Sequence, residues 1–280
     1  MNLLHKAPTG LGHHAVVADG HPSLDRIRIA VLRLAPGEAY AGETGAWESA
    51  LVLQAGAGTI AVESHGIAHR CARQNVFAGP SSTVFVAPEQ TWEVRADGNS
   101  ALELIVCSTP GKAGMNSQVI TADQLKLRKV GKGNWYRTIY DIVDAPFPAH
   151  TMVLGETFNP PGFWSSAPPH KHEVDDPPHE SEHEEAYLFR ISPSRGFGMQ
   201  RVYTDDGSLN ESYTVEDGDV VAIPRGYHPV VAGPGYQLYY LWILAGNQRV
   251  LAPRDDPNHA WLKDSEAVIT AVGGMGTPAG

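Results

Sequence analysis

The residues best suited to chemistry are crowded into one segment, residues 170–185, with the sequence HKHEVDDPPHESEHEE. Most of it, residues 175–183, has turn prolines and no apolar periodicity, which is typical of a solvated acidic loop. Its two ends are different. His170 and His172 are separated by one residue, and alternate residues of a β-strand project to the same face. Both imidazoles can therefore reach one ion while Lys171 points away.

Two later segments could complete a metal site. Glu185 opens an apolar stretch that would place Glu185, Tyr187 and Phe189 on one face of a strand. Residues 218–228, GDVVAIPRGYH, have the pattern of a strand, a proline–glycine turn and then His228. Three imidazoles and one carboxylate would form a ligand set suited to Zn, Mn, Fe, Co or Ni, with an open position for water or a substrate oxygen. An H-x-H pair alone is weak evidence, and His228 alone could be a hydrogen-bonded surface histidine after a turn, so the prediction rests on the combined pattern.

The elements expected to position these residues are short β-strands. The chain has 280 residues, and its 29 glycines and 21 prolines punctuate many short apolar runs, which indicates strands joined by tight turns. Only residues 121–129 suggest a short helix or turn. The expected strands are 27–34, 50–62, 83–87, 101–107, 152–158, 185–191, 198–204, 220–223 and 237–244.

A weak internal repeat relates the two halves. VFVAP at residues 84–88 aligns with VVAIP at residues 220–224, and each copy is followed by a further apolar strand. A duplicated β-domain explains this pattern. We therefore expect an all-β chain of two tandem barrels, residues 1–129 and 130–265, followed by a flexible tail, residues 266–280.

The same alignment makes a prediction about the first barrel. It places Trp92 at the position of His228, and Glu48 is the nearest counterpart of Glu185. An indole cannot ligate a metal, so the first barrel should lack a metal ion.

Composition narrows the function. The formal net charge is -10 and no Lys/Arg cluster occurs, which argues against a nucleic-acid partner. The chain shows neither the apolar core of a signal peptide nor a run of membrane-spanning length. Cys71 and Cys107 are expected to be ordinary thiols in a reducing compartment, which favours a cytoplasmic protein. A barrel edge could pair with a second copy, so a homo-oligomer is expected.

The two metal motifs, H-x-H…E and G-x5-P-x-G-x-H, resemble those of the cupin superfamily. Longer strings, including PPGFWSSAPPHKH, EEAYLFR, GFGMQRVYTDDGS, DGDVVAIPRGYHPVVAGPGYQLYYLWILAG and DDPNHAW, closely resemble the 5-deoxy-glucuronate isomerase family of bacterial myo-inositol catabolism. The resemblance covers the second half and, more faintly, the whole length. A more distant similarity is to the ketol-isomerases of pectin-derived 5-keto-uronates.

This resemblance implies two tandem cupin barrels (double-stranded β-helix, jelly-roll-like), a bicupin. It also implies a divalent metal bound by His170, His172, Glu185 and His228. The implied activity is that of an aldose–ketose isomerase converting 5-deoxy-D-glucuronate to 2-deoxy-5-keto-D-gluconate, with a small sugar acid as substrate.

The sequence departs from the common cupin pattern in two places. The interval from His172 to the glutamate is long, which leaves Glu184 as a rival to Glu185. The Glu-x-Tyr pattern of the isomerases favours Glu185. In the second motif only one residue separates Gly226 from His228, where most cupins have two.

Isomerisation moves a proton between adjacent carbons and requires stabilisation of charge on oxygen. Tyr187 is the preferred phenolic donor. The remaining candidates come from strands and loops near the metal motifs: Gln200, Arg201, Tyr239 or Tyr240, His259 and, for the substrate carboxylate, Arg137. Each has a structural alternative: Arg201 could pair with Asp205 or Asp206, the tyrosines could be core residues, and His259 could cap a loop.

Two other functions share these features. A cupin oxygenase could use the same three-histidine, one-glutamate site with iron or copper. A non-catalytic sugar-binding cupin could use the metal only to hold the barrel. Oxygen uptake would indicate the first, and tight binding of an unchanged ligand the second.

Overall fold

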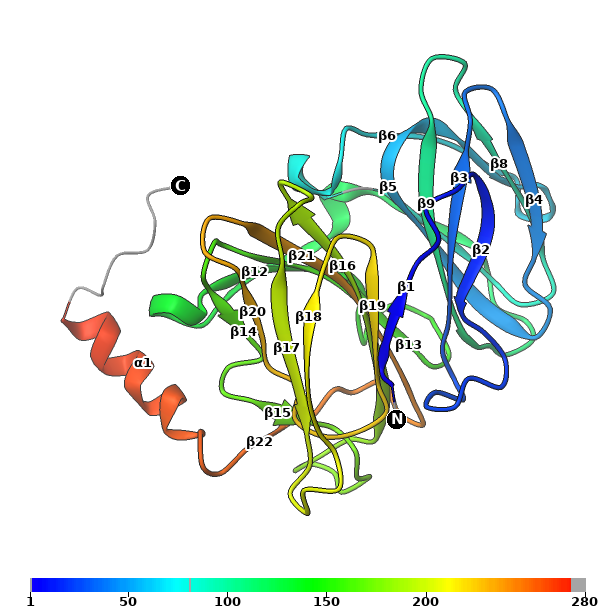
Figure 1. Cartoon of the computed structure of the whole chain (residues 1–280). Coiled ribbons are helices and arrows are strands. Elements are labelled where there is room, and N and C mark those ends of the chain that lie inside the picture. Colours follow the sequence, from blue (N-terminus) through cyan, green and yellow to red (C-terminus); the bar gives the residue numbers. More distant parts are fainter. Residues whose placement is uncertain (1, 81, 273–280) are drawn as a thin grey trace.

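The computed structural model describes residues 2–80 and 82–272, and its regular secondary structure is mostly β-strand (Figure 1). The all-β prediction is confirmed. One sheet has the strand order β1 (Leu4–Lys6), β19 (Asp219–Ile223), β16 (His183–Ser192), β21 (Gln237–Gly246), β13 (Met152–Asn159), β12 (Arg137–Val143) and β11 (Lys126–Val130). A smaller sheet, β14 (Trp164–Ser165), β20 (Val230–Ala232), β17 (Gly198–Tyr203) and β18 (Asn210–Val215), closes the second barrel.

The first half forms a nine-stranded sheet. Its main path is β10 (Gln118–Ile120), β7 (Thr83–Val86), β5 (Trp47–Val62), β9 (Leu102–Pro110), β3 (Arg28–Leu34) and β2 (Gly12–Val17). The other three strands are β4 (Ala39–Glu43), β8 (Thr91–Ala96) and β6 (Ile67–Arg73). β6 and β8 each pair with the long strand β5, and β4 pairs with β8. A separate pair joins β15 (His170–Lys171) to β22 (Arg254–Asp255).

Helical structure is sparse among the described residues. Single 3₁₀ turns occur at Glu63–His65, Val76–Ala78, Ala122–Gln124 and Gly133–Trp135, and one α-helix, α1, spans Trp261–Ala271. The segment 121–129 contains the expected turn, but its second part belongs to β11. The position between residues 129 and 130, expected to divide the domains, falls within that strand. Of the expected tail, residues 266–271 lie in α1, and residues 273–280 lie outside the described part of the chain.

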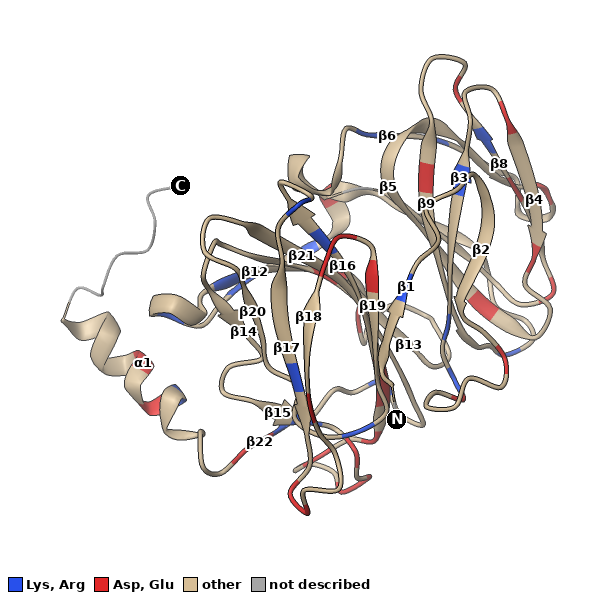
Figure 2. Ribbon diagram, viewed as in Figure 1, with Lys and Arg blue, Asp and Glu red and all other residues tan. Residues whose placement is uncertain are grey.

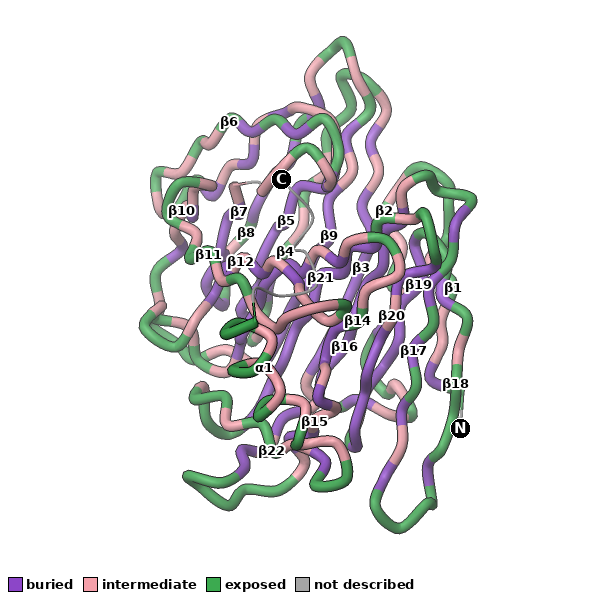
Figure 3. The backbone as a smooth tube through the Cα atoms, turned by 90° about the vertical axis from the view of Figure 1, so that its left-hand side faces the viewer, coloured by how far each residue is buried: buried purple, intermediate pink, exposed green. Residues whose placement is uncertain are grey.

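The central strands are buried on both faces (Figure 3). On β21, Tyr239, Leu241 and Ile243 belong to a large apolar cluster drawn from both halves of the chain, which fills the layer between the two main sheets. Tyr240 and Trp242 belong to the core of the second barrel. Strands of this kind appear in the sequence as continuous apolar runs, because neither face is left for polar residues.

The two main sheets share a strand order, as the internal repeat predicts, because β7, β5 and β9 match β19, β16 and β21. On β7 and β19 the register differs by one residue from the sequence alignment, which matches Val86 with Ala222. Val86 and Ile223 both face the inside of their barrels, and they lie opposite Ser49 and Glu185. The structural counterpart of Glu185 is therefore Ser49, not Glu48 as expected, because a shift of one residue turns a side chain to the other face.

Charged residues lie on strands and loops of both halves, and acidic residues gather on the loops at the lower end of the second barrel (Figure 2). No helix within the described residues is long and apolar enough to cross a membrane.

Candidate metal centre

Three buried side chains, His172, Glu185 and His228, converge inside the second barrel, with one ligand atom from each lying within 4.8 Å of the other two. Glu185 Oε2 is 3.0 Å from His172 Nε2 and 3.1 Å from His228 Nε2. Within residues 2–80 and 82–272, no other group of three His, Cys, Asp or Glu side chains is arranged in this way. Two imidazoles and a carboxylate so placed can bind one metal ion.

The backbone fixes which ring nitrogen faces Glu185. His172 Nδ1 lies 3.0 Å from the His183 carbonyl oxygen, and His228 Nδ1 lies 2.9 Å from the Gly226 carbonyl oxygen. A carbonyl oxygen only accepts, so each Nδ1 carries the proton and each neutral ring presents its Nε2 lone pair to the centre. His228 Nε2 is buried and makes no hydrogen bond, which is costly unless a ligand satisfies it. The donor set therefore fits a divalent metal ion, since metal-binding histidines usually have their second nitrogen anchored in this manner.

Electrostatics support the same conclusion. Burial by itself raises the pKa of Glu185, but the adjoining imidazoles of His172 and His228 outweigh it and lower that pKa to about 2. Desolvation lowers the pKa of His170 well below its usual value. The site therefore offers an ionised carboxylate at Glu185 and a neutral imidazole at His170, the forms that bind metals. Burial alone would lower the pKa of His172, but the hydrogen bond to Glu185 outweighs it and raises that pKa, so a metal ion binding there would displace a proton.

Strand alternation and one tight turn position the ligands. Glu185 and Tyr187 face the barrel interior from β16, and Glu185 pairs with Ile223 of β19. The turn after β19 returns the chain so that His228 reaches Glu185. Gly226 in this turn has φ +90°, and a Cβ there would lie 2.5 Å from the Tyr203 carbonyl oxygen. Only glycine fits this position.

The neighbours of the ligands point elsewhere. Glu184 accepts hydrogen bonds from the backbone N–H groups of Asp25 and Arg26, at 2.8 and 2.9 Å. Lys171 Nζ donates to Glu173 at 2.6 Å and to Asp205 at 2.7 Å and is directed away from the histidines. The structure thus brings Glu185, and not Glu184, to the two imidazoles.

His170 lies beside the three-residue group. Its ring centroid is 4.9 Å from that of His228 and 6.3 Å from that of His172. Its nitrogens lie outside the 4.8 Å cluster, although the side chain lines the same pocket.

That pocket has a volume of about 460 Å³ and is lined by Glu185, Tyr187, Tyr240 and Arg137. The two tyrosine rings stack at a centroid distance of 4.3 Å, and Ser165 Oγ lies 2.8 Å from the Tyr240 hydroxyl. Arg137 is buried. It donates to the Trp135 carbonyl oxygen at 3.2 Å and pairs with no carboxylate among the described residues. Its charge is available to an anion in the pocket.

Gln200 and Arg201 face opposite ways on β17, as alternation requires. Gln200 points into the second barrel, is fully buried, and neither of its amide atoms has a hydrogen-bond partner. Arg201 is exposed and donates to Asn210 Oδ1 at 3.1 and 2.9 Å. It pairs with neither of the aspartates expected from the sequence.

Tyr239 and His259 lie away from the pocket. Tyr239 faces the layer between the barrels and donates to Glu156 at 2.9 Å. His259 is about half exposed and lies 4.0 Å from Asp256, and it does not line the pocket. The inward-facing tyrosine of β21 is Tyr240.

Sequence reasoning missed the contribution of α1. Lys263 and Glu266 of this helix line the pocket. Lys263 Nζ forms an ion pair with Asp255 at 2.5 Å, and Trp135 Nε1 donates a hydrogen bond to Glu266 at 2.9 Å. The run of helix-forming residues in WLKDSEAVITA was the available signal.

The acidic loop also differs from expectation. Residues 174–179 are exposed, but Glu180 is fully buried. Its carboxylate accepts hydrogen bonds from the backbone N–H groups of Glu173 and Val174, at 2.8 and 3.1 Å. The loop is therefore folded back against the barrel rather than fully solvated.

The chain is similar to known proteins over most of its length. A family model described as the KduI/IolB family matches residues 3–262. A protein named 5-deoxy-glucuronate isomerase from Geobacillus thermodenitrificans is 40% identical over 237 residues, 84% of this chain and 86% of that relative. One of the same name from Bacillus subtilis strain 168 is 32% identical over 260 residues, 92% of this chain and 95% of the relative.

Solved structures extend the comparison. An IolB-like protein from Salmonella typhimurium LT2 matches with a TM-score of 0.89 and 32% identity, over 94% of this chain and 100% of that one. The oxalate decarboxylase of Lactobacillus farciminis matches at TM-score 0.67 and 14% identity, over 98% and 94% of the two chains, which shows the fold alone. The predicted tandem cupin barrels are confirmed. Since the family model matches nearly the whole length, the chain belongs to the KduI/IolB family.

Proposed function

We propose that this chain is a metal-dependent aldose–ketose isomerase that converts 5-deoxy-D-glucuronate to 2-deoxy-5-keto-D-gluconate in myo-inositol catabolism. One observation carries the proposal: the cluster of His172, Glu185 and His228 adjoins a pocket whose wall contains the unpaired cation of Arg137. A metal site and a buried guanidinium in one pocket suit a substrate with a carbonyl at one end and a carboxylate at the other. The names of the relatives at 40% and 32% identity support this substrate.

The proposed ligands are His172, Glu185 and His228, with His170 as the fourth. The ion is divalent, one of Zn, Mn, Fe, Co or Ni. When bound, it supplies Lewis-acid polarisation of the substrate carbonyl and its neighbouring hydroxyl.

The chain's own residues bind and orient the sugar acid. Arg137 holds the carboxylate by charge-assisted hydrogen bonds. Burial raises the pKa of Tyr240, so its hydroxyl stays protonated at neutral pH and donates to a substrate oxygen on which negative charge develops. Tyr187, on the same face as Glu185, and Gln200, with two unpaired amide atoms, are the other proposed donors. This proposal gives no role to Arg201, which is exposed, to Tyr239, which faces the layer between the barrels, or to His259, which does not line the pocket.

The wider assignments are also proposals. Residues 1–129 would form a barrel without metal ligands, apart from β1 and β11, which pair in the main sheet of the second barrel, and residues 130–265 would carry the active site. The protein would work in the cytoplasm on a small molecule, without nucleic-acid or membrane partners. A homo-oligomer would form through exposed sheet edges.

The test is incubation of the metal-loaded protein with 5-deoxy-glucuronate in deuterated water under anaerobic conditions, followed by NMR. Formation of 2-deoxy-5-keto-gluconate, with loss of turnover in His172→Ala, is the expected result. Turnover that requires oxygen would indicate a cupin oxygenase. Binding of an unchanged sugar acid, without turnover, would indicate a sugar-binding cupin.

A further inference from the structure

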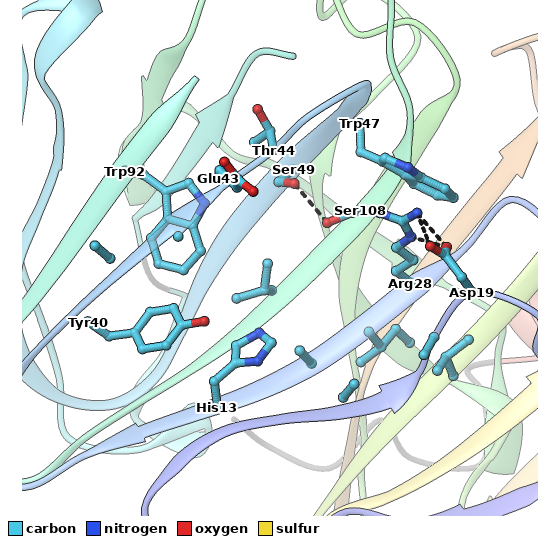
Figure 4. Close-up of a pocket in the computed structure, with 18 of the residues that line it drawn as sticks. His13, Asp19, Arg28, Tyr40, Glu43, Thr44, Trp47, Ser49, Trp92 and Ser108 are labelled. Atoms are coloured by element: carbon cyan, nitrogen blue, oxygen red, sulfur yellow. Dashed lines mark hydrogen bonds and ion pairs between the residues drawn. The ribbon is translucent and has the colours of Figure 1, made fainter. Parts of the chain in front are cut away.

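The first barrel contains a second pocket, with a volume of about 680 Å³ (Figure 4). It lies inside the barrel between β2, β3 and β9 on one side and β4 and β8 on the other. It is thus the counterpart of the metal pocket in the second barrel. Ser49, which lines it, occupies the structural position of Glu185. The duplicated pocket has kept its cavity but carries different chemistry.

One wall of this pocket is aromatic. His13 stacks on Tyr40 at a centroid distance of 5.2 Å and an interplanar angle of 7°, and Tyr40 lies 5.6 Å from Trp92. The indole of Trp92 lies over Gly42, where a Cβ would come within 2.3 Å of the ring. Glycine at this position therefore allows the wall to form. Flat ring faces of this kind pack against the C–H face of a pyranose or cyclohexane ring, with little loss of side-chain entropy.

The floor of the pocket provides hydroxyl groups. Ser49 Oγ and Ser108 Oγ lie 2.7 Å apart. Both residues are buried, and both line the cavity. A hydroxyl both donates and accepts, so the pair can exchange hydrogen bonds with the hydroxyls of a ligand. Figure 4 shows this pair between the aromatic wall and a charged group at the opposite end.

The charged group does not offer a free cation. Arg28 donates from two nitrogens to the Asp19 carboxylate, and its guanidinium carbon lies 3.5 Å from the centroid of a Trp47 ring. Glu43 adds a second carboxylate to the lining. With one arginine against two acids, the pocket is formally negative and disfavours an anion. The metal pocket differs, because the cation of Arg137 is unpaired there.

We propose that the first barrel binds a neutral sugar or cyclic polyol of about one pyranose ring, at a site independent of the metal centre. The cavity is within the range of roughly 300–1,000 Å³ usual for small-molecule sites. Its combination of ring faces, hydroxyls and no free cation selects a neutral polyhydroxylated ring over a sugar acid. This proposal does not depend on the isomerase assignment.

The experiment is a calorimetric and saturation-transfer NMR titration of the metal-loaded full chain. The probes are methyl β-D-glucopyranoside, which is neutral and cannot ring-open, and methyl β-D-glucuronide, its anionic match. Tyr40→Ala removes part of the aromatic wall. Ala15→Leu, at an exposed position of β2 that lines the pocket, fills the cavity without touching the core. His14→Ala, the adjacent residue on the other face of β2, is the matched control.

The expected result is millimolar binding of the neutral glycoside, weakened at least about tenfold by Tyr40→Ala and by Ala15→Leu. His14→Ala and Arg137→Met should leave that binding unchanged. The proposal is overturned if the neutral glycoside does not bind, or if Ala15→Leu leaves its binding intact. A further comparison uses Arg137→Met, in which the metal pocket has lost the cation that would bind a glucuronide carboxylate. The proposal is also overturned if, in this variant, the glucuronide binds more tightly than the neutral glycoside.

Discussion

Replacing Arg137 with methionine separates substrate binding from stability. Arg137 lines the metal pocket with no carboxylate partner among the described residues. Two charge-assisted hydrogen bonds to a substrate carboxylate would together contribute about 3–4 kcal/mol, so kcat/KM should fall by roughly 10²–10³. The folded protein loses only a contact with the Trp135 carbonyl oxygen, and it no longer buries an unpaired charge. The free energy of unfolding should therefore stay within about 1 kcal/mol of the wild type or rise.

The assay is steady-state turnover followed by NMR, with thermal unfolding of the same samples. The matched control is Arg128→Met, because Arg128 lines the same pocket but is held by Asp141, with two hydrogen bonds of 2.6 Å. It should change kcat/KM by less than roughly threefold. The reasoning fails if Arg137→Met keeps kcat/KM within that range. It also fails if the variant loses activity only in proportion to a loss of folded protein.

Three other predictions concern stability and reactivity. Glu48 accepts backbone hydrogen bonds of 2.6–2.9 Å at the start of β13, so Glu48→Gln should lower the free energy of unfolding in urea by about 2–4 kcal/mol; an unchanged midpoint would contradict this role. The Arg73–Glu156 pair is buried at 2.7 Å, so Arg73→Met alone should cost about 3–5 kcal/mol. Adding Glu156→Leu should restore part of that loss in a double-mutant cycle. Burial raises the pKa of Cys71 to about 11 and also raises that of Cys107. Thiolate is therefore scarce at pH 8, and a disulfide reagent should label neither thiol until the pH approaches 11; rapid labelling at pH 8 would argue against this burial.

Much of the metal centre could be predicted from spacing. Because side chains alternate along a strand, Glu185 and Tyr187 were predicted to share one face, and Lys171 was predicted to point away from the histidines. The structure has both arrangements. The choice between Tyr239 and Tyr240 was left open for a physical reason. Both faces of β21 are buried, so no alternation of polar and apolar residues indicates which tyrosine faces the pocket.

Other features depend on contacts that spacing does not encode. The sequence alignment of the repeat, carried back at a constant offset, gives Ser49 as the counterpart of Glu185; Glu48 was chosen only because it is the nearest glutamate. The alignment did miss a one-residue shift on the neighbouring strand, where the structure matches Val86 with Ile223 rather than with Ala222, because consecutive apolar residues look alike in sequence. The availability of Arg137 depends on which acids surround it after folding. The role of α1 in lining the pocket follows from its packing against residues far away in the sequence, such as Trp135.

The most direct test of the account is to measure bound metal and isomerase turnover in the same samples of wild type, Glu185→Gln and Glu184→Gln. Glu184 is adjacent on β16 but binds backbone N–H groups on the opposite face. We predict about one divalent ion per chain and full turnover in the wild type and Glu184→Gln, and loss of both in Glu185→Gln. Full turnover in wild type stripped of metal, or in Glu185→Gln, would contradict a metal centre at His172, Glu185 and His228.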